Sequence, residues 1–178
     1  MKQNVTIIGD CYASGERHFM DQWQAFRAAT LRPLFVYFAR WPVTPDGLTL
    51  LSLLFGLAFF PLLFVSYPLA FDCLFTHAVL DGLDGPLARY LGTASRRGSF
   101  TDTMVDQLVV TTTTAALMKL GANSLEVGLA YIVTYGALVA FSMVRNAMAI
   151  PYSWVVRPRL VIYLWMPIEL YVWPGTLE

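Results

Sequence analysis

Long runs of mostly apolar residues are the feature that most limits what this sequence can fold into. The first extends from Leu48 to Val65, and others cover residues 69–91, 98–120, 125–148 and, more briefly, 159–173. A helix needs about 20 apolar residues to cross a bilayer. Of the 178 residues, 57% are hydrophobic and 13% are charged, whereas about 25% are charged in soluble domains. The chain has too little polar surface for a soluble fold, so we predict an integral membrane protein.

The fold expected from these runs is all-α. We predict a polytopic transmembrane helix bundle of five to six spans, preceded by an amphipathic helix on the membrane surface. Apolar residues recur at helical spacing over residues 18–40, with arginines between them, as in helices that lie in the interface. Pro33 is expected to break or kink that helix. We divide the chain into a polar N-terminal segment (1–17), a juxtamembrane amphipathic helix (18–42) and a transmembrane catalytic bundle (43–178).

Basic residues set the expected orientation in the membrane. Arginines precede the first apolar run, and others lie on the same side of the later runs: Arg89, Arg96, Arg97, Arg145, Arg157 and Arg159. Cytoplasmic loops are enriched in Lys and Arg, so we expect the N-terminus and the loops at 92–97 and 149–158 to face the cytoplasm. The net charge is +0, and no nucleic acid is expected as a partner because phosphate binding needs a basic excess.

Four aspartates lie inside the predicted spans: Asp81, Asp84, Asp102 and Asp106. An ionised side chain at the bilayer centre costs at least about 2.5–3.5 kcal/mol, so intramembrane acids indicate a functional site. Residues three or four apart share a helix face, and the two spans are antiparallel, so both pairs lie at a similar depth. If those faces pack together, four carboxylates converge. Oxygen ligands of this kind suit a divalent cation, and Mg²⁺ is the expected ion when phosphates supply further ligands.

Small residues and one arginine accompany the aspartates. Gly85, Ala88 and Gly98 would let a helix backbone or a ligand approach closely, and Arg89 could donate hydrogen bonds to a phosphate. Each residue also has a simpler interpretation. Small residues often serve helix packing, an arginine near a helix end often anchors at the interface, and paired intramembrane acids can form a cation pathway. Taken singly, these residues leave both interpretations open.

The spacing of these residues resembles a family signature. Residues 81–106 fit the pattern D-x2-D-G-x2-A-R-x8-G-x3-D-x3-D of the CDP-alcohol phosphotransferase family. All eight specified positions match: Asp81, Asp84, Gly85, Ala88, Arg89, Gly98, Asp102 and Asp106. The resemblance extends to the amphipathic helix and the multispan layout, although the family typically has six spans and we count five. In place of the family's Pro-Asn turn before the first span, this chain has Pro45-Asp46.

The resemblance implies an enzyme that transfers a substituted phosphate from a CDP-alcohol to an acceptor hydroxyl and releases CMP. By this likeness, Asp81, Asp84 and Asp102 would bind two Mg²⁺ ions, with Mn²⁺ as an alternative. Asp106 would complete the metal site and act as the general base. The CDP pocket would comprise Asp81, Gly85, Ala88, Arg89 and Gly98. Family members are commonly homodimers, so a homodimer is expected as well.

The substrates are less constrained than the reaction. We expect CDP-diacylglycerol as donor, since a membrane site can admit lipid between its helices, and a small polar alcohol as acceptor, in phospholipid synthesis. The reverse assignment, a CDP-choline or CDP-ethanolamine donor with diacylglycerol as acceptor, stays open. An alternative of another class is a divalent-cation carrier, which would not explain the spaced glycines and arginine. Candidate ligands for an acceptor phosphate are Arg145, Arg157 and Arg159, which the positive-inside rule explains equally well.

Two further residues stand out within the apolar runs. His77 lies one helical turn before Asp81 and shares its helix face. We predict an interior histidine satisfied by hydrogen bonds in preference to a substrate ligand. Glu169 lies in the last apolar run, and we assign it no role.

Overall fold

The computed structural model describes residues 14–148, 163–164 and 168, and this part of the chain is all-α, as predicted. It contains five helices and no strand. Most of the polar segment 1–17 and of the apolar run 159–173 lies outside the described residues, so the predictions for those segments are not examined by the structure.

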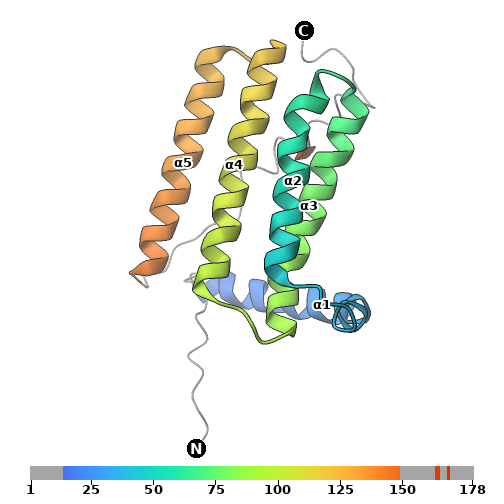
Figure 1. Cartoon of the computed structure of the whole chain (residues 1–178). Helices are drawn as coiled ribbons and strands as arrows, with labels where there is room; N and C mark the ends of the chain where they lie inside the picture. Colours follow the sequence, from blue (N-terminus) through green and yellow to red (C-terminus); the bar gives the residue numbers. More distant parts are fainter. Residues whose placement is uncertain (1–13, 149–162, 165–167, 169–178) are drawn as a thin grey trace, which may run out of the picture.

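Four helices stand beside one another in an up-and-down arrangement (Figure 1). Their bounds fall within three residues of the predicted apolar runs: α2 Pro45–Leu63, α3 Tyr67–Tyr90, α4 Arg96–Leu120 and α5 Leu125–Ala147. Short connections force consecutive helices to run antiparallel. The end where α2 and α4 begin and α3 and α5 finish carries Arg89, Arg96, Arg97 and Arg145, and we call it the basic end.

The helix starts are specified by local sequence. Thr44, Ser95 and Ser124 are N-cap residues, and their side chains accept hydrogen bonds from the backbone N–H groups of Gly47, Gly98 and Val127. Such caps satisfy N–H groups that have no partner inside the helix. At the other end of α4, Gly121 has φ +81°, a left-handed conformation that glycine adopts without steric strain.

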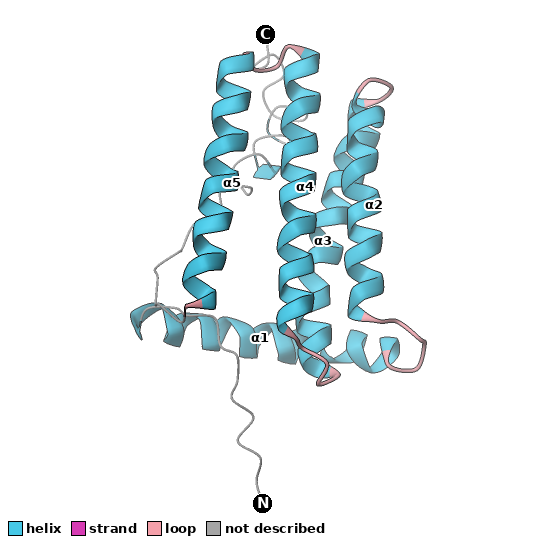
Figure 2. Ribbon diagram, turned by 60° about the vertical axis from the view of Figure 1, so that its left-hand side comes forward, coloured by secondary structure: helices cyan, strands magenta, loops and turns pink. Residues whose placement is uncertain are grey.

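The first helix, α1 (Ser14–Phe38), crosses the basic end of the bundle (Figure 2). Large apolar side chains on it are exposed, among them Phe19, Trp23 and Phe26. The helix continues through Pro33, so of the break or kink predicted there, a break is absent. Pro33 removes the backbone hydrogen bond to the carbonyl of Ala29, but Ala29 is exposed and water or a lipid headgroup can replace that bond.

Two apolar clusters hold the helices together. Away from α1, one cluster joins α2, α3 and α4 through Phe59, Leu63, Ala70, Leu74, Val105, Val109, Ala116 and Leu117. Beside α1, a smaller cluster joins α1, α2 and α3 through Phe35, Leu48 and Leu87. The space between these clusters, toward the basic end, contains the polar residues of the candidate site.

The outside of the bundle is apolar as well. α2 and α5 are the described helices that are long and apolar enough to cross a membrane, whereas α3 and α4 carry the aspartates and several basic residues. Only 11% of the most apolar stretch of α5 is buried, and large side chains such as Leu54, Val133 and Phe141 are exposed. An apolar exterior of this extent indicates a surface that contacts lipid.

Candidate functional site

The four aspartates lie toward the basic end of two neighbouring helices. Asp81 and Asp84 occupy the later part of α3, and Asp102 and Asp106 the earlier part of α4. Asp84 is 5% exposed and Asp106 is 9% exposed, while Asp81 and Asp102 are half-buried. Because the helices are antiparallel, both pairs lie at a similar depth, as the sequence predicted.

Asp84 is the most enclosed of the four carboxylates. The hydroxyl of Thr49 on α2 donates to Asp84 Oδ2 at 2.6 Å, and the backbone N–H of Gly85 donates to Oδ1 at 2.5 Å. The side chains of Asp102 on α4 and Asp81 on α3 lie near Asp84. The structure therefore brings the carboxylates of α3 and α4 together at Asp84 and Asp102.

Asp84 and Asp102 approach each other through their side chains, because the backbones of α3 and α4 are not in close contact. α2 packs closely against both α3 and α4, whereas α3 and α4 are not closely packed against each other. α2 and α4 approach each other closely at Gly56, where an added Cβ would lie 2.3 Å from Val109 Cγ2. α2 thus acts as the support that holds the aspartate-bearing helices at a distance where carboxylates, and not backbones, meet.

The aspartates provide the right donors for a divalent cation. Within the described part of the chain, no three Asp, Glu, His or Cys side chains already stand at metal-ligand spacing. The Oδ1 atoms of Asp81, Asp102 and Asp106 are buried and receive no hydrogen bond from the described residues, although each of these side chains has other interactions. Carboxylate oxygens are the ligands that Mg²⁺ and Mn²⁺ prefer, so the chemistry of these donors suits such an ion, although the described side chains do not stand at ligand spacing.

The glycines of the site are not explained by packing within the protein. A Cβ added to Gly85 would have Arg89 Nη1 as its nearest neighbour, at 3.6 Å, and one added to Gly98 would meet Ser95 Oγ at 3.4 Å. Both are ordinary van der Waals distances. Gly56 and Gly128 differ, because a Cβ there would lie 2.3 Å from Val109 and 2.1 Å from Met118. Gly85 and Gly98 therefore leave space that the described protein does not use.

The remaining predicted CDP-binding residues, Ala88 and Arg89, are on the last turns of α3. Ala88 is half-buried and Arg89 is exposed. The guanidinium of Arg89 lies beside Gly85, and its two terminal nitrogens are the nearest atoms to a Cβ added there. An exposed cation beside a glycine with free space is an arrangement that can contact a phosphate.

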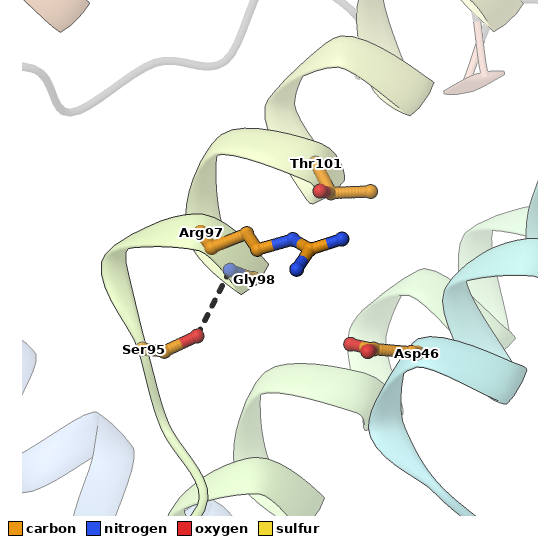
Figure 3. Close-up of a pocket in the computed structure, with 5 residues that line it drawn as sticks. All are labelled: Asp46, Ser95, Arg97, Gly98 and Thr101. Carbon is orange, nitrogen blue, oxygen red and sulfur yellow. Dashed lines mark hydrogen bonds between the residues drawn. The ribbon is translucent and has the colours of Figure 1, made fainter.

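A pocket opens at the basic end between the first turns of α2 and α4. Its volume is about 240 Å³, and it is lined by Asp46, Ser95, Arg97, Gly98 and Thr101. Figure 3 shows the side chains of Arg97 and Asp46 directed into the same space from opposite sides, while Ser95 Oγ accepts from the backbone N–H of Gly98. The pocket connects Gly98 of the predicted CDP site with Asp46, the residue that replaces asparagine in the resembling family.

Of the three arginines considered for an acceptor phosphate, the structure describes one. Arg145 is in the last turn of α5, at the basic end, and its guanidinium carbon lies 5.5 Å from the ring centroid of Phe141. Arg157 and Arg159 lie outside the described residues, as does Glu169. Arg145 therefore has a suitable location, and a joint arginine site stays a prediction.

His77 is fully buried, 0% exposed, and both of its ring nitrogens have polar neighbours. Nδ1 lies 2.7 Å from the hydroxyl and 3.1 Å from the carbonyl oxygen of Ser52, and the Ser52 hydroxyl lies 3.2 Å from the carbonyl oxygen of His77. Nε2 lies 3.2 Å from the hydroxyl of Tyr163. These contacts agree with the predicted interior histidine satisfied by hydrogen bonds.

Sequence reasoning missed one stripe of α2. Thr49, Ser52 and Gly56 are all buried, and they contact Asp84, His77 and Val109 respectively. Their spacing of three and four residues places them on one helix face. Small and polar residues on one face of a leucine-rich run were the sequence feature available for this prediction. They could have indicated that α2 packs against the two helices that carry the aspartates.

Comparisons with known proteins address the same region. A model of the CDP-alcohol phosphatidyltransferase family matches residues 42–175. Among curated proteins, an uncharacterized protein of Aquifex aeolicus (strain VF5) is 40% identical over 78 residues, which cover 43% of this chain and 40% of that protein. The chain thus matches less than half the length of this relative. No solved structure matches the chain.

The matched region begins just before α2 and contains all four aspartates together with Gly85, Ala88, Arg89 and Gly98. It spans well over half of the sequence. The chain therefore belongs to the CDP-alcohol phosphatidyltransferase family.

Proposed function

We propose that this protein transfers a phosphatidyl group from CDP-diacylglycerol to the hydroxyl of a small polar alcohol and releases CMP. Family membership supports the reaction class, the transfer of a phospho-alcohol from a CDP-alcohol. The observation that carries the proposal is the proximity of Asp84 and Asp102 beside two glycines, Gly85 and Gly98, whose free space is not filled by any of the described residues. A packing site would fill that space, whereas a phosphate-binding site requires it.

The aspartates would divide the chemical roles. Asp81, Asp84 and Asp102 would hold two Mg²⁺ ions, with Asp106 completing the set. When bound, such ions offset the charge of the diphosphate and of the leaving CMP. Asp106 would accept the proton of the acceptor hydroxyl as its oxygen bonds to the lipid-side phosphorus and the bond from that phosphorus to the CMP oxygen breaks. Thr49 would keep the Asp84 carboxylate in a fixed orientation through its hydrogen bond.

The donor would enter from the membrane side. The apolar exteriors of α2 and α5 suit acyl chains, and the nucleotide would lie toward the basic end. Asp81, Gly85, Ala88, Arg89 and Gly98 would form the CDP pocket. The arginine-bearing pocket at Gly98 is continuous with this location and provides positive charge for phosphates.

The acceptor would come from the aqueous side of the basic end. Arg145 lies at that end on α5, and we propose that it acts with Arg157 and Arg159 on a phosphorylated alcohol. The positive-inside rule places the basic end in the cytoplasm. In this arrangement residues 1–17 precede a surface helix (18–42), and residues 43–178 form the transmembrane catalytic bundle. A homodimer stays a prediction from the family.

The deciding experiment is CMP release by the purified protein in detergent or lipid. The assay contains Mg²⁺, CDP-diacylglycerol and a panel of acceptor alcohols, both phosphorylated and unphosphorylated. The control is Asp106→Asn, which preserves side-chain size and removes the base. We expect acceptor-dependent CMP release that disappears in the control and on chelation of Mg²⁺ by EDTA.

The assay also separates the alternatives. CMP release only from CDP-choline or CDP-ethanolamine with diacylglycerol would reverse the assignment of donor and acceptor. Metal flux through protein-containing vesicles, without CMP release from any CDP-linked donor, would refute the transferase and support a cation carrier.

A further inference from the structure

A proline interrupts the hydrogen bonding of α3 at the candidate site. In an α-helix the N–H of each residue donates to the carbonyl four residues earlier. Pro86 lies inside α3 and has no N–H, so the carbonyl of Gly82 loses its usual donor. Gly82 lies between Asp81 and Asp84, and a buried carbonyl without a donor is destabilising. The turn that carries both aspartates therefore needs a hydrogen-bond donor from elsewhere.

The donor comes from α1. The guanidinium of Arg27 donates from Nη2 to the carbonyl oxygen of Gly82, and the contact is partly buried. Arg27 and Gly82 are 55 residues apart in the sequence. Arginine suits this task because its guanidinium is permanently charged and presents several N–H groups in a rigid plane.

Apolar contacts fix Arg27 in this location. Leu31 and Phe35 follow Arg27 at intervals of four residues and so share its helix face. Phe35 is 1% exposed and packs with Leu87 of α3, with Leu31 and Leu83 beside them. The face of α1 that packs on α3 is thus apolar. Arg27 lies at one end of this face and reaches the turn of α3 that carries Asp81 and Asp84.

We propose that Arg27 is a positioning residue that holds the Asp81–Asp84 turn of α3 in place of the helical hydrogen bond that Pro86 removes. The surface helix α1 then has a role besides lying on the membrane: it completes the backbone of the helix that presents two of the four carboxylates. The effect on metal binding rests on the function proposed above, whereas the hydrogen bond itself does not.

The proposal predicts an unusual rescue. Pro86→Ala restores an N–H that can donate to Gly82, so it makes Arg27 dispensable. Arg27→Met keeps the length and apolar stem of the side chain but has no donor. The matched control is Arg32→Met, which removes one positive charge from an exposed position of the same helix. Gly82→Ala is a second control, since its Cβ would lie 3.8 Å from Arg27 Nη2 and the carbonyl is retained.

Two measurements are made on each purified full-length variant. The first is thermal unfolding in detergent, analysed as a double-mutant cycle of Arg27→Met and Pro86→Ala. The second is binding of Mn²⁺ alone, followed by electron paramagnetic resonance without substrate. We expect Arg27→Met to lower the unfolding temperature and to weaken Mn²⁺ binding about tenfold. In the Pro86→Ala background both effects should shrink to less than about half, and Arg32→Met should have neither effect.

Equal effects of Arg27→Met in both backgrounds, or effects no larger than those of Arg32→Met, would overturn the proposal. If Pro86→Ala does not fold, Arg27→Lys decides, because lysine retains a donor: recovery relative to Arg27→Met supports the proposal, and equal loss refutes it. A rescue seen in unfolding and Mn²⁺ binding, in protein that releases no CMP, would support the role of Arg27 and refute the proposed function instead.

Discussion

The two halves of the bundle use small residues in opposite ways. Toward the end away from α1, Gly56 and Gly128 allow close packing, because a Cβ would lie 2.3 Å from Val109 and 2.1 Å from Met118. Toward the basic end, the described residues come no nearer than 3.4 Å to a Cβ added at Gly85 or Gly98. At these four positions the same residue type therefore permits close packing in one half and leaves space in the other.

Hydroxyl groups show the same contrast. In the apolar half, Thr114 donates to the carbonyl of Val110 at 2.8 Å, and Thr76 to that of Asp72 at 2.7 Å, so each satisfies its own helix. Near the basic end, Thr49 reaches Asp84 on another helix at 2.6 Å. Thr114 and Thr76 thus satisfy carbonyls of their own helices, whereas Thr49 contacts a carboxylate on another helix.

The largest expected effect is a difference in activity between substitutions of two aspartates on α3, Asp84 and Asp72. Asp84→Asn should lower CMP release at least about a hundredfold, because an amide cannot supply the charge that a metal ligand contributes, and such terms amount to several kcal/mol. Asp72→Asn, at an exposed position near the start of α3, should leave activity within about twofold. Similar losses in both variants would show that the contrast between the halves is not functional.

The next effect is on stability. Gly56→Ala should lower the free energy of unfolding by about 1–3 kcal/mol, because the added methyl overlaps Val109. Thermal unfolding in detergent measures this change, and the activity per folded molecule should stay near that of the wild type. An unchanged unfolding temperature would mean that α2 and α4 can separate without penalty at this point.

Gly85→Ala is the same chemical change in the other half. It should leave the unfolding temperature nearly unchanged, since the added Cβ makes only ordinary contacts. We expect CMP release to fall about tenfold, equivalent to about 1.4 kcal/mol, through a higher KM for the CDP-linked donor. Steady-state kinetics over a range of donor concentrations provide the test, and loss of stability with normal kinetics would contradict it.

The smallest expected effect concerns the support of Asp84. Thr49→Val keeps the shape of the side chain and removes the donor to Oδ2. A hydrogen bond of this type contributes about 1 kcal/mol, so the Mg²⁺ concentration at half-maximal activity should rise about fivefold. Thr49→Ser retains the hydroxyl and serves as control. The role assigned to Thr49 would fail if serine and valine behaved alike.

Much of the fold was predictable because it depends on local properties. Four predicted apolar runs coincide with α2 to α5 within three residues, since length and hydrophobicity are set by consecutive residues. Pro33 was the exception. A break or kink was predicted from the proline alone, and the exposure of Ala29 explains why the helix can continue there without a break.

The candidate site was predictable only in part. The aspartates, glycines and Arg89 follow one another within 26 residues, so their spacing was visible as a pattern. Thr49, Ser52 and Arg27 were not identified, because each acts on a residue of a different helix. A hydroxyl within an apolar run has no distinguishing sequence feature until its partner is known.

The sequence by itself determined that the chain has apolar helices, that four carboxylates lie in two neighbouring ones, and that their spacing is that of a family. Helical geometry and bilayer thickness translate such local patterns directly into structure. Only the tertiary structure decided that Thr49 orients Asp84 over a separation of 35 residues and that Arg27 reaches Gly82 over 55. Hydrogen bonds between distant residues depend on how whole helices pack, and that packing is a property of the assembled bundle.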